Sequence, residues 1–178
     1  MFIDRSTLNS FGERVRKPSG ESVVYVDDAN NRVVKVKDPY AKDNLKGHAA
    51  SDALYEHIIH NLLFPNTQYR LLGISDDAVG GVRFVLEQDI IRQDVPATQA
   101  DIDQYLTKEL GLTKVEKPYL HYENDYYSIT DVDASGDNVF IDGEGAICFI
   151  DPIIKFKKPA QDVINYLTTG NAIAAARA

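Results

Sequence analysis

Two runs of β-branched residues constrain the fold of this 178-residue chain more than any other feature. They are SVVYV at 22–26 and RVVKVK at 32–37, joined by the turn-forming residues DDANN. Such runs favour extended strands, and a short connection rich in Asp and Asn favours an antiparallel hairpin. Alternation along the second strand places Lys35 and Lys37 on the same face as Val33. Lysine therefore interrupts an otherwise apolar face.

After this hairpin the apolar spacing becomes helical, from about residue 45 to Phe64, and Pro65 ends the pattern. The predicted core-facing stripe consists of Leu54, Tyr55, Ile58, Ile59 and Leu62. Glu56 lies outside this stripe. Two more strands are predicted next, YRLLGI at 69–74 and RFVLEQ at 83–88.

The segment TQADIDQYLTKELG at 98–111 predicts a second helix, with Thr98 as N-cap, Asp101 three residues later and Gly111 at the end. Small hairpins and a closing helix are predicted downstream, at 118–130, 138–150 and 159–170. This order of elements predicts an α+β fold rather than a βαβ alternation.

Composition excludes several classes of partner. A net charge of −8 argues against non-specific nucleic-acid binding and against docking on an anionic membrane, because either requires clustered Lys and Arg. No segment reaches the ~18 apolar residues of a membrane span. The single cysteine, Cys148, lies in the apolar run AICFI, so we expect a buried, inert thiol and a cytoplasmic setting.

The segment DVDASGDNVFID at 131–142 has two incompatible interpretations. Asp131, Asp133, Ser135 and Asp142 fall where an EF-hand calcium loop places oxygen ligands. Alternatively, Asp133 and Asn138 form the D-x-x-x-x-N pattern of a kinase catalytic loop.

The flanking sequence favours the second interpretation. An EF-hand loop needs a helix on each side and an apolar residue at its eighth position, but here both flanks are strand-like and Asn138 is eighth. The predicted hairpin after Asn138 returns the chain to Asp151, which brings these two residues close together. Two oxygen ligands and a nearby acid suit a magnesium–nucleotide site.

At these positions the sequence resembles the protein-kinase superfamily, since the spacing from Asp133 to Asn138 to Asp151 matches its catalytic loop and metal-binding aspartate. VVKVK stands where that family carries its lysine, and Glu56 follows in the next helix. More closely, HNLLFPNTQYRLLGI, ATQADIDQYL and NVFIDGEGAICFIDPII resemble the small kinase domain of polyvalent proteins from bacterial mobile elements and phages. The resemblance covers roughly residues 19–156.

The resemblance implies a minimal protein-kinase-like fold. Its N-lobe, an antiparallel sheet plus a helix, would span residues 19–88, and a truncated C-lobe would span 89–178, after a flexible lead-in at 1–18. Only 27 residues follow Asp151, which leaves no room for most of the lobe that docks peptide substrates. An acceptor would therefore have to be docked by something else.

For the nucleotide, the resemblance implies that Lys35 holds the α- and β-phosphates and that Glu56 orients Lys35. On periodicity alone, Lys37 is an equal candidate for the lysine. Gly20 is the one glycine left in SGESVVY to cover the phosphates. Glu87 and Gln88, in FVLEQ, would offer hinge backbone groups to adenine.

For the chemistry, the resemblance implies that Asp133 orients or deprotonates the acceptor hydroxyl and that Asn138 and Asp151 hold magnesium. As a carboxylate after five apolar residues, Asp151 is also expected to be paired, hydrogen-bonded or metal-bound.

Several positions depart from the pattern. Asp131 and Val132 replace the usual His and Arg, so a phosphate on an activation loop would find no arginine here. Ser135 stands where many kinases have a lysine, and Pro152 follows the metal-binding aspartate.

The sequence thus predicts an ATP- and magnesium-dependent phosphotransferase that acts on a hydroxyl, with a protein as substrate or partner. The alternative is a catalytically weak or inactive nucleotide-binding or interaction module of a mobile element.

Overall fold

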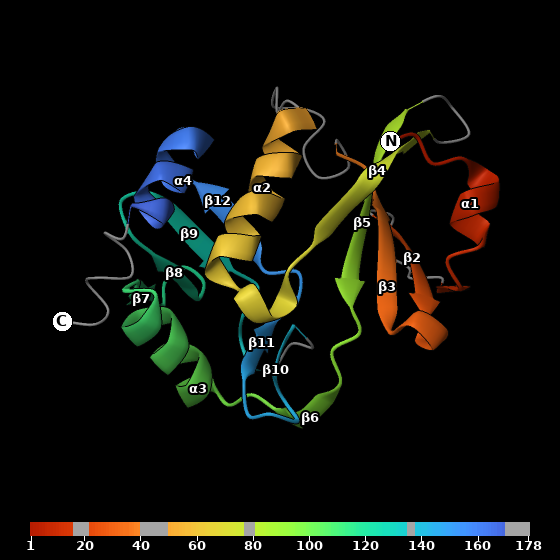
Figure 1. The fold of residues 1–178 in the computed structure, drawn as a ribbon. Helices are drawn as coiled ribbons and strands as arrows, with labels where there is room; N and C mark the ends of the chain where they lie inside the picture. The colour runs from red at the N-terminus through yellow and green to blue at the C-terminus, as the bar shows by residue number, and fades with distance from the viewer. Residues whose placement is uncertain (16–21, 40–49, 77–80, 135–137, 170–178) are drawn as a thin grey trace. The chain divides into compact units, whose positions relative to one another are not determined.

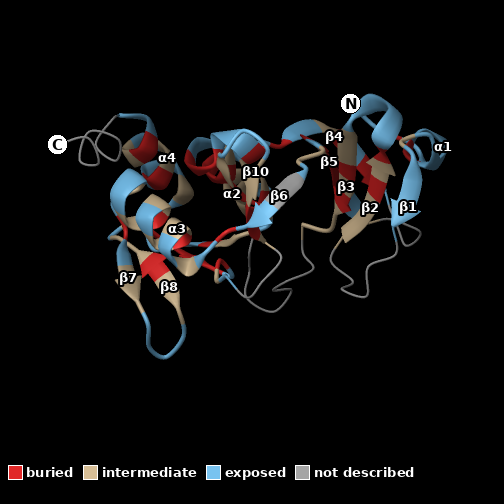
Figure 2. Ribbon diagram, turned by 90° about the horizontal axis from the view of Figure 1, so that it is seen from below, coloured by how far each residue is buried: buried red, intermediate tan, exposed pale blue. Residues whose placement is uncertain are grey.

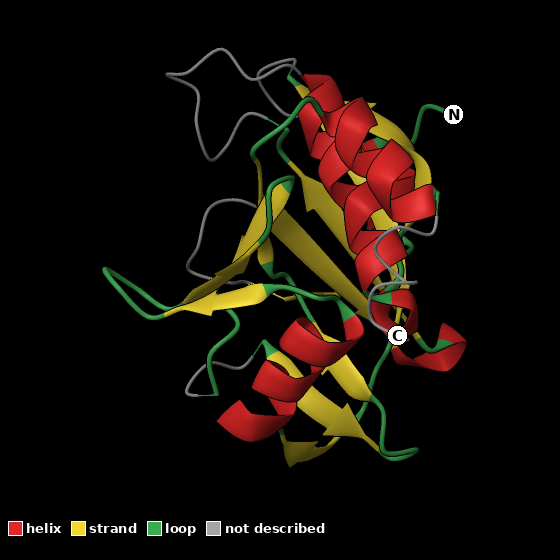
Figure 3. Ribbon diagram, turned by 90° about the vertical axis from the view of Figure 1, so that its left-hand side faces the viewer, coloured by secondary structure: helices red, strands yellow, loops and turns green. Residues whose placement is uncertain are grey.

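The computed structural model describes residues 1–15, 22–39, 50–76, 81–134 and 138–169 (Figure 1). The chain divides into two compact units: the first comprises Met1–Leu54 and Gln68–Ile90, and the second Tyr55–Thr67 and Ile91–Ala178. Antiparallel sheets and a few helices build both units (Figure 3), which confirms the α+β prediction.

The first unit contains one five-stranded antiparallel sheet with the strand order β1-β2-β3-β5-β4. Its strands are β1 (Glu13–Val15), β2 (Ser22–Asp27), β3 (Arg32–Lys37), β4 (Arg70–Asp76) and β5 (Val82–Asp89). The predicted β2–β3 hairpin is present, and its turn closes through Asn31 in the left-handed region at φ 52°. Val34 and Val36 are buried whereas Lys35 and Lys37 are half-buried, as the alternation predicts.

The amino-terminal residues contribute a short helix, α1 (Arg5–Asn9), in the stretch expected to be a lead-in. Ahead of it, the Ile74 N–H of β4 donates to the Met1 carbonyl at 2.9 Å, and the Ile74 carbonyl accepts the Ile3 N–H at 2.8 Å. The chain's own first residues therefore pair with the outer edge of β4. A Cβ at Gly73 would lie 2.2 Å from the Met1 carbonyl oxygen, so this approach requires glycine.

Helix α2 (Ala50–Leu63) is present, but the predicted core-facing stripe is wrong in part. Ile58 and Leu62 are 46% and 41% exposed, whereas Ile59 and Leu63 are 0% and 1% exposed. Each pair is four residues apart, so the helix carries two adjacent apolar ridges and periodicity cannot select between them. Packing decides the choice, because Phe64 at the end of the helix joins the buried core of the second unit.

The second unit contains two antiparallel sheets, with strand orders β11-β10-β6 and β12-β9-β8-β7. The strands are β6 (Gln93–Pro96), β7 (Thr113–Val115), β8 (His121–Glu123), β9 (Tyr127–Thr130), β10 (Val139–Asp142), β11 (Ile147–Phe149) and β12 (Ile153–Phe156). The hairpins β8–β9 and β10–β11 were predicted from the sequence, whereas β6 and β7 were not.

Helix α3 (Gln99–Gln104) starts as predicted, because Thr98 and Asp101 form a reciprocal capping box. It continues as a π-helical turn over Tyr105–Glu109, and Gly111 follows in the left-handed region at φ 66°. Helix α4 (Ala160–Thr168) is the predicted closing helix.

Each unit has its own core, and Figure 2 shows the buried positions in red. The largest fully buried side chains of the second unit are Tyr122, Tyr127, Phe149, Ile59, Leu63, Ile102, Leu106 and Ile129. Among the helices of the described ranges, none has the length and apolar character needed to cross a membrane.

Candidate functional site

The predicted site residues are distributed over both units. Lys35, Glu87 and Gln88 belong to the first unit, and Glu56, Asp133, Asn138 and Asp151 belong to the second. Gly20 and Ser135 lie outside the described residues. Glu56 is a half-buried residue of helix α2. The site is therefore described one unit at a time.

Lys35 lies in the middle of β3, where it pairs with Val24 of β2 and Leu86 of β5. Its Nζ donates a hydrogen bond to Tyr69 Oη at 2.9 Å and lies 4.9 Å from the centroid of that ring. The buried Tyr69 thus orients the ammonium group through both its hydroxyl and its ring. An ammonium group in this setting can serve as a point charge for a phosphate. Sequence reasoning missed Tyr69, although it opens the predicted strand YRLLGI.

The predicted hinge residues lie at the end of β5. The Glu87 carboxylate forms ion pairs with Arg32 at 2.9 Å and with Arg70 at 3.0 Å. The hydrogen bond between Arg32 and Glu87 is the main cause that raises the pKa of Arg32, and the hydrogen bond between Arg32 and Asp27 is the second. The Glu87 side chain is therefore committed to cross-strand pairing. Its backbone is also flanked on both sides, by Val34 of β3 and by Arg70 of β4.

Beyond Glu87 the sheet narrows, because β4 begins at Arg70. Gln88 and Asp89 pair with β3, opposite Val33 and Arg32.

In the second unit, residues 131–134 form the start of the predicted catalytic loop. The loop leaves β9 at Asp131, whose φ of 61° is left-handed. Val132 is 2% exposed and belongs to the core. The next residue, Asp133, is half-buried, and the Ala134 N–H donates to Gln99 Oε1 at 3.2 Å. The loop is therefore attached on both sides of Asp133.

Asn138 ends the loop and carries two further contacts. Its Nδ2 donates to Asp131 Oδ2 at 2.9 Å, and its backbone carbonyl accepts the Ile150 N–H at 2.7 Å. The second bond places Asn138 beside the residue that precedes Asp151. Because Nδ2 is bound to Asp131, the side-chain oxygen Oδ1 is the atom that could ligate a cation.

Asp151 is exposed although it follows five apolar residues, so an ionised carboxylate pays no large desolvation cost there. Its backbone is the unusual feature, with φ at 53°. Ile153 of β12 pairs with Thr130 of β9, so Asp131 and Asp151 lie at the same end of this strand pair.

One amide oxygen and one or two exposed carboxylates suit magnesium better than calcium. Magnesium accepts few protein ligands and completes its octahedron with phosphate and water. Over the described ranges, no group of three or more His, Cys, Asp or Glu residues could hold a metal ion. The side-chain oxygens of Asn138 and Asp151 are of the kind that magnesium accepts.

The calcium-loop interpretation does not fit this geometry. Strands β9 and β10, not helices, flank the segment. Asp142, the last ligand in that interpretation, accepts the N–H groups of Glu144 and Ala146, each at 2.9 Å. The bond from Ala146 is the main cause that lowers the pKa of Asp142. This carboxylate closes the β10–β11 turn.

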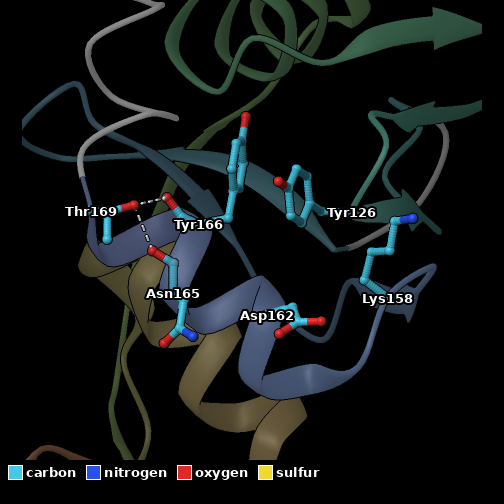
Figure 4. Close-up of a pocket in the computed structure, with 6 residues that line it drawn as sticks. All are labelled: Tyr126, Lys158, Asp162, Asn165, Tyr166 and Thr169. Atoms are coloured by element: carbon cyan, nitrogen blue, oxygen red, sulfur yellow. Dashed lines mark hydrogen bonds between the residues drawn. The ribbon is translucent and has the colours of Figure 1, made fainter.

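A hollow of about 470 Å³ lies elsewhere in the second unit (Figure 4). Its lining residues are Tyr126, Lys158, Asp162, Asn165, Tyr166 and Thr169. The rings of Tyr126 and Tyr166 stack with their centroids 4.1 Å apart. Tyr126 precedes β9 and Lys158 follows β12, whereas Asp131 and Asp151 lie at the opposite end of that strand pair. The hollow is therefore separate from the loop site.

The model of a family described as serine/threonine/tyrosine kinase found in polyvalent proteins matches residues 1–158. No curated protein and no solved structure matches the chain.

Proposed function

Because this chain belongs to the serine/threonine/tyrosine kinases found in polyvalent proteins, we propose that it binds ATP with magnesium and transfers the γ-phosphoryl group to a protein hydroxyl. The observation that carries this proposal is the anchored loop of the second unit, in which Asn138 contacts both Asp131 and the residue before Asp151. We further propose a minimal kinase-like fold with residues 19–88 as its N-lobe and residues 89–178 as its truncated C-lobe.

In this proposal Lys35 holds the α- and β-phosphates, and Glu56 orients Lys35. The backbone at Gln88, near the end of β5, is offered to adenine. Gly20 belongs to the segment that covers the phosphates.

The transfer step involves three residues of the second unit. Asp133 accepts a hydrogen bond from the acceptor hydroxyl and takes its proton as the new bond to the γ-phosphorus forms. The bond between the γ-phosphorus and the bridging oxygen breaks, and ADP leaves with its electron pair. Asn138 and Asp151 would hold magnesium, which, when bound, neutralises charge on the phosphate oxygens.

Nucleotide binding is tested by thermal unfolding with and without Mg-ATP. At a ligand concentration 100 times Kd, mass action gives about 2.7 kcal/mol of stabilisation, or about 5–10 °C in Tm for a chain of this size. Lys35→Met should abolish this shift. Lys37→Met is the matched control, because Lys37 lies on the same face of β3 but at its end. An unchanged Tm of the wild-type protein at millimolar Mg-ATP would refute the nucleotide site, and an effect confined to Lys37→Met would reassign the lysine.

Catalysis is tested by transfer of labelled γ-phosphate to the protein itself or to an added protein. Asp133→Asn should abolish labelling and leave the Mg-ATP shift intact, because this residue acts on the acceptor. A Mg-ATP shift without labelling of any offered acceptor would favour the alternative, a non-catalytic nucleotide-binding module. Val132 is buried at the position where the protein-kinase superfamily usually has a charged arginine, and this observation favours the alternative.

A further inference from the structure

The amide group of Gln99 lies at the centre of a polar network behind the predicted catalytic loop. Its Oε1 accepts the N–H of Ala134 at 3.2 Å. Its Nε2 donates to Asp103 Oδ1 at 2.9 Å and to Tyr122 Oη at 2.8 Å. All three partners belong, like Gln99, to the second unit. The side chain thus links the loop to helix α3 and strand β8.

The network fixes which end of the amide faces the loop. Asp103 also accepts bonds from Lys114 Nζ, at 2.7 Å, and from the hydroxyl of Tyr122. Burial opposes ionisation of Asp103, but the bonds from Lys114, Tyr122 and Gln99 outweigh it and lower the pKa. An ionised carboxylate only accepts hydrogen bonds, so the amino group of Gln99 faces Asp103. Its oxygen must then face Ala134.

Local structure places each partner. Gln99 is the first residue of α3, directly after the N-cap Thr98, so the capping box fixes where the helix begins. Gln99 and Asp103 are four residues apart and therefore lie on one face of the helix. Lys114 of β7 lies directly opposite Tyr122 of β8, so their side chains share a face of the sheet.

We propose that Gln99 is a positioning residue that holds Asp133 for phosphoryl transfer; this inference rests on the proposed function. The residue before Asp133 is buried in the core, and the residue after it donates its N–H to Gln99. The core therefore holds the backbone before Asp133, and the bond to Gln99 holds the backbone after it. Gln99 acts on the rate through Asp133 and makes no contribution to nucleotide affinity.

The experiment compares Gln99→Leu with Gln161→Leu. Gln161 also bonds to a residue four positions later, Asn165, at 3.1 Å, but it is exposed on α4. Gln99→Leu should lower kcat by about tenfold to a hundredfold, since small misplacements of reacting groups have effects of that size, with KM for ATP unchanged. In the ligand-free protein, the amide of Ala134 should exchange with solvent about threefold to tenfold faster. Gln161→Leu should change neither quantity.

A complementary pair of substitutions separates positioning from folding. Gln99→Glu alone places a carboxylate against Asp103 and should lower kcat. Combining it with Asp103→Asn reverses the donor and the acceptor in this contact, retains an acceptor for the Ala134 N–H, and should restore most of kcat.

The outcomes distinguish this inference from the proposed function. If the wild-type protein transfers phosphate and Gln99→Leu has a normal kcat or normal exchange at Ala134, the positioning role is refuted and the kinase activity stands. A lowered kcat in Gln99→Glu that the added Asp103→Asn fails to restore would likewise overturn it. If the wild-type protein transfers no phosphate, the proposed function fails and the positioning role fails with it.

Discussion

Two buried tyrosines of the second unit should respond in opposite ways to the loss of their hydroxyl groups. Tyr122 and Tyr127 lie on the neighbouring strands β8 and β9, and both are 0% exposed. The Tyr122 hydroxyl donates to Asp103 and accepts from Gln99. Within the described part of the chain, the Tyr127 hydroxyl has no partner in good hydrogen-bonding geometry, although the Asn124 amide lies near it. The same substitution, Tyr→Phe, therefore removes a satisfied hydroxyl in one case and an unsatisfied one in the other.

The magnitudes follow from these contacts. A hydrogen bond to a charged group contributes about 1.5–3 kcal/mol, so Tyr122→Phe should lower the free energy of unfolding by about 2 kcal/mol. For a chain of this size that corresponds to a fall in Tm of about 4–8 °C. Tyr127→Phe removes a buried polar atom that costs free energy when unpaired, so it should leave stability unchanged or raise it by up to about 1 kcal/mol.

The assay is urea unfolding of both variants beside the wild-type protein, followed by far-UV circular dichroism. Both tyrosines belong to one unit, so both variants report on the same transition. A loss of stability in Tyr127→Phe equal to that in Tyr122→Phe would show that the two hydroxyls are equivalent. The hydrogen-bond reasoning would then be refuted.

Three further predictions concern single groups. Burial, and secondarily the charge of Asp142, raises the pKa of the Cys148 thiol to about 12. Iodoacetamide at pH 8 should therefore alkylate this thiol roughly a thousandfold more slowly in the native protein than in the unfolded protein, as measured by mass spectrometry. Equal alkylation rates would contradict this prediction. Asp131→Asn should weaken Mg-ATP binding because Asp131 orients Asn138, whereas Asp142→Asn should not; micromolar calcium binding that is lost in both Asp131→Asn and Asp142→Asn would revive the calcium loop. Because the folded pKa of Asp103 is lowered, its stabilisation is present above about pH 4 and is lost as pH falls through the folded pKa. The stability advantage of the wild-type protein over Asp103→Asn, measured by urea midpoints, should therefore shrink below about pH 4, and a constant advantage would exclude an ionised Asp103.

Sequence patterns predict the helices and strands of this chain well where a pattern is compatible with only one choice of buried face. The alternation in RVVKVK gives both the strand and the buried face of β3, because only one register buries two valines. The N-cap at Thr98 is likewise local chemistry. Periodicity fails on α2, where Ile58 and Ile59 each head an apolar ridge and only tertiary packing selects between them. Strand β6 pairs with the distant β10, and such pairing leaves no local signal.

For the candidate site, spacing predicts which residues could act but not what holds them. The sequence points to Asp133 and Asn138 through one short motif. Gln99, by contrast, lies 35 positions before Ala134, and no spacing rule connects the two. The exposure of Asp151 was likewise not predictable, because an apolar run predicts burial only of its own residues and the residue that follows it can face solvent.

The pairing of the first residues with β4 has a practical consequence for handling this protein. An unpaired sheet edge is a template for other strands, and an edge with exposed apolar residues invites aggregation. Leu71 and Ile74 of β4 are 52% and 41% exposed, so residues 1–3, which pair with this edge, protect it from pairing with other chains. Deleting residues 1–3 should make the protein more prone to aggregate. Replacing Gly73 with a larger residue that displaces Met1 should have the same effect. A shortened form of this protein should therefore retain residues 1–3.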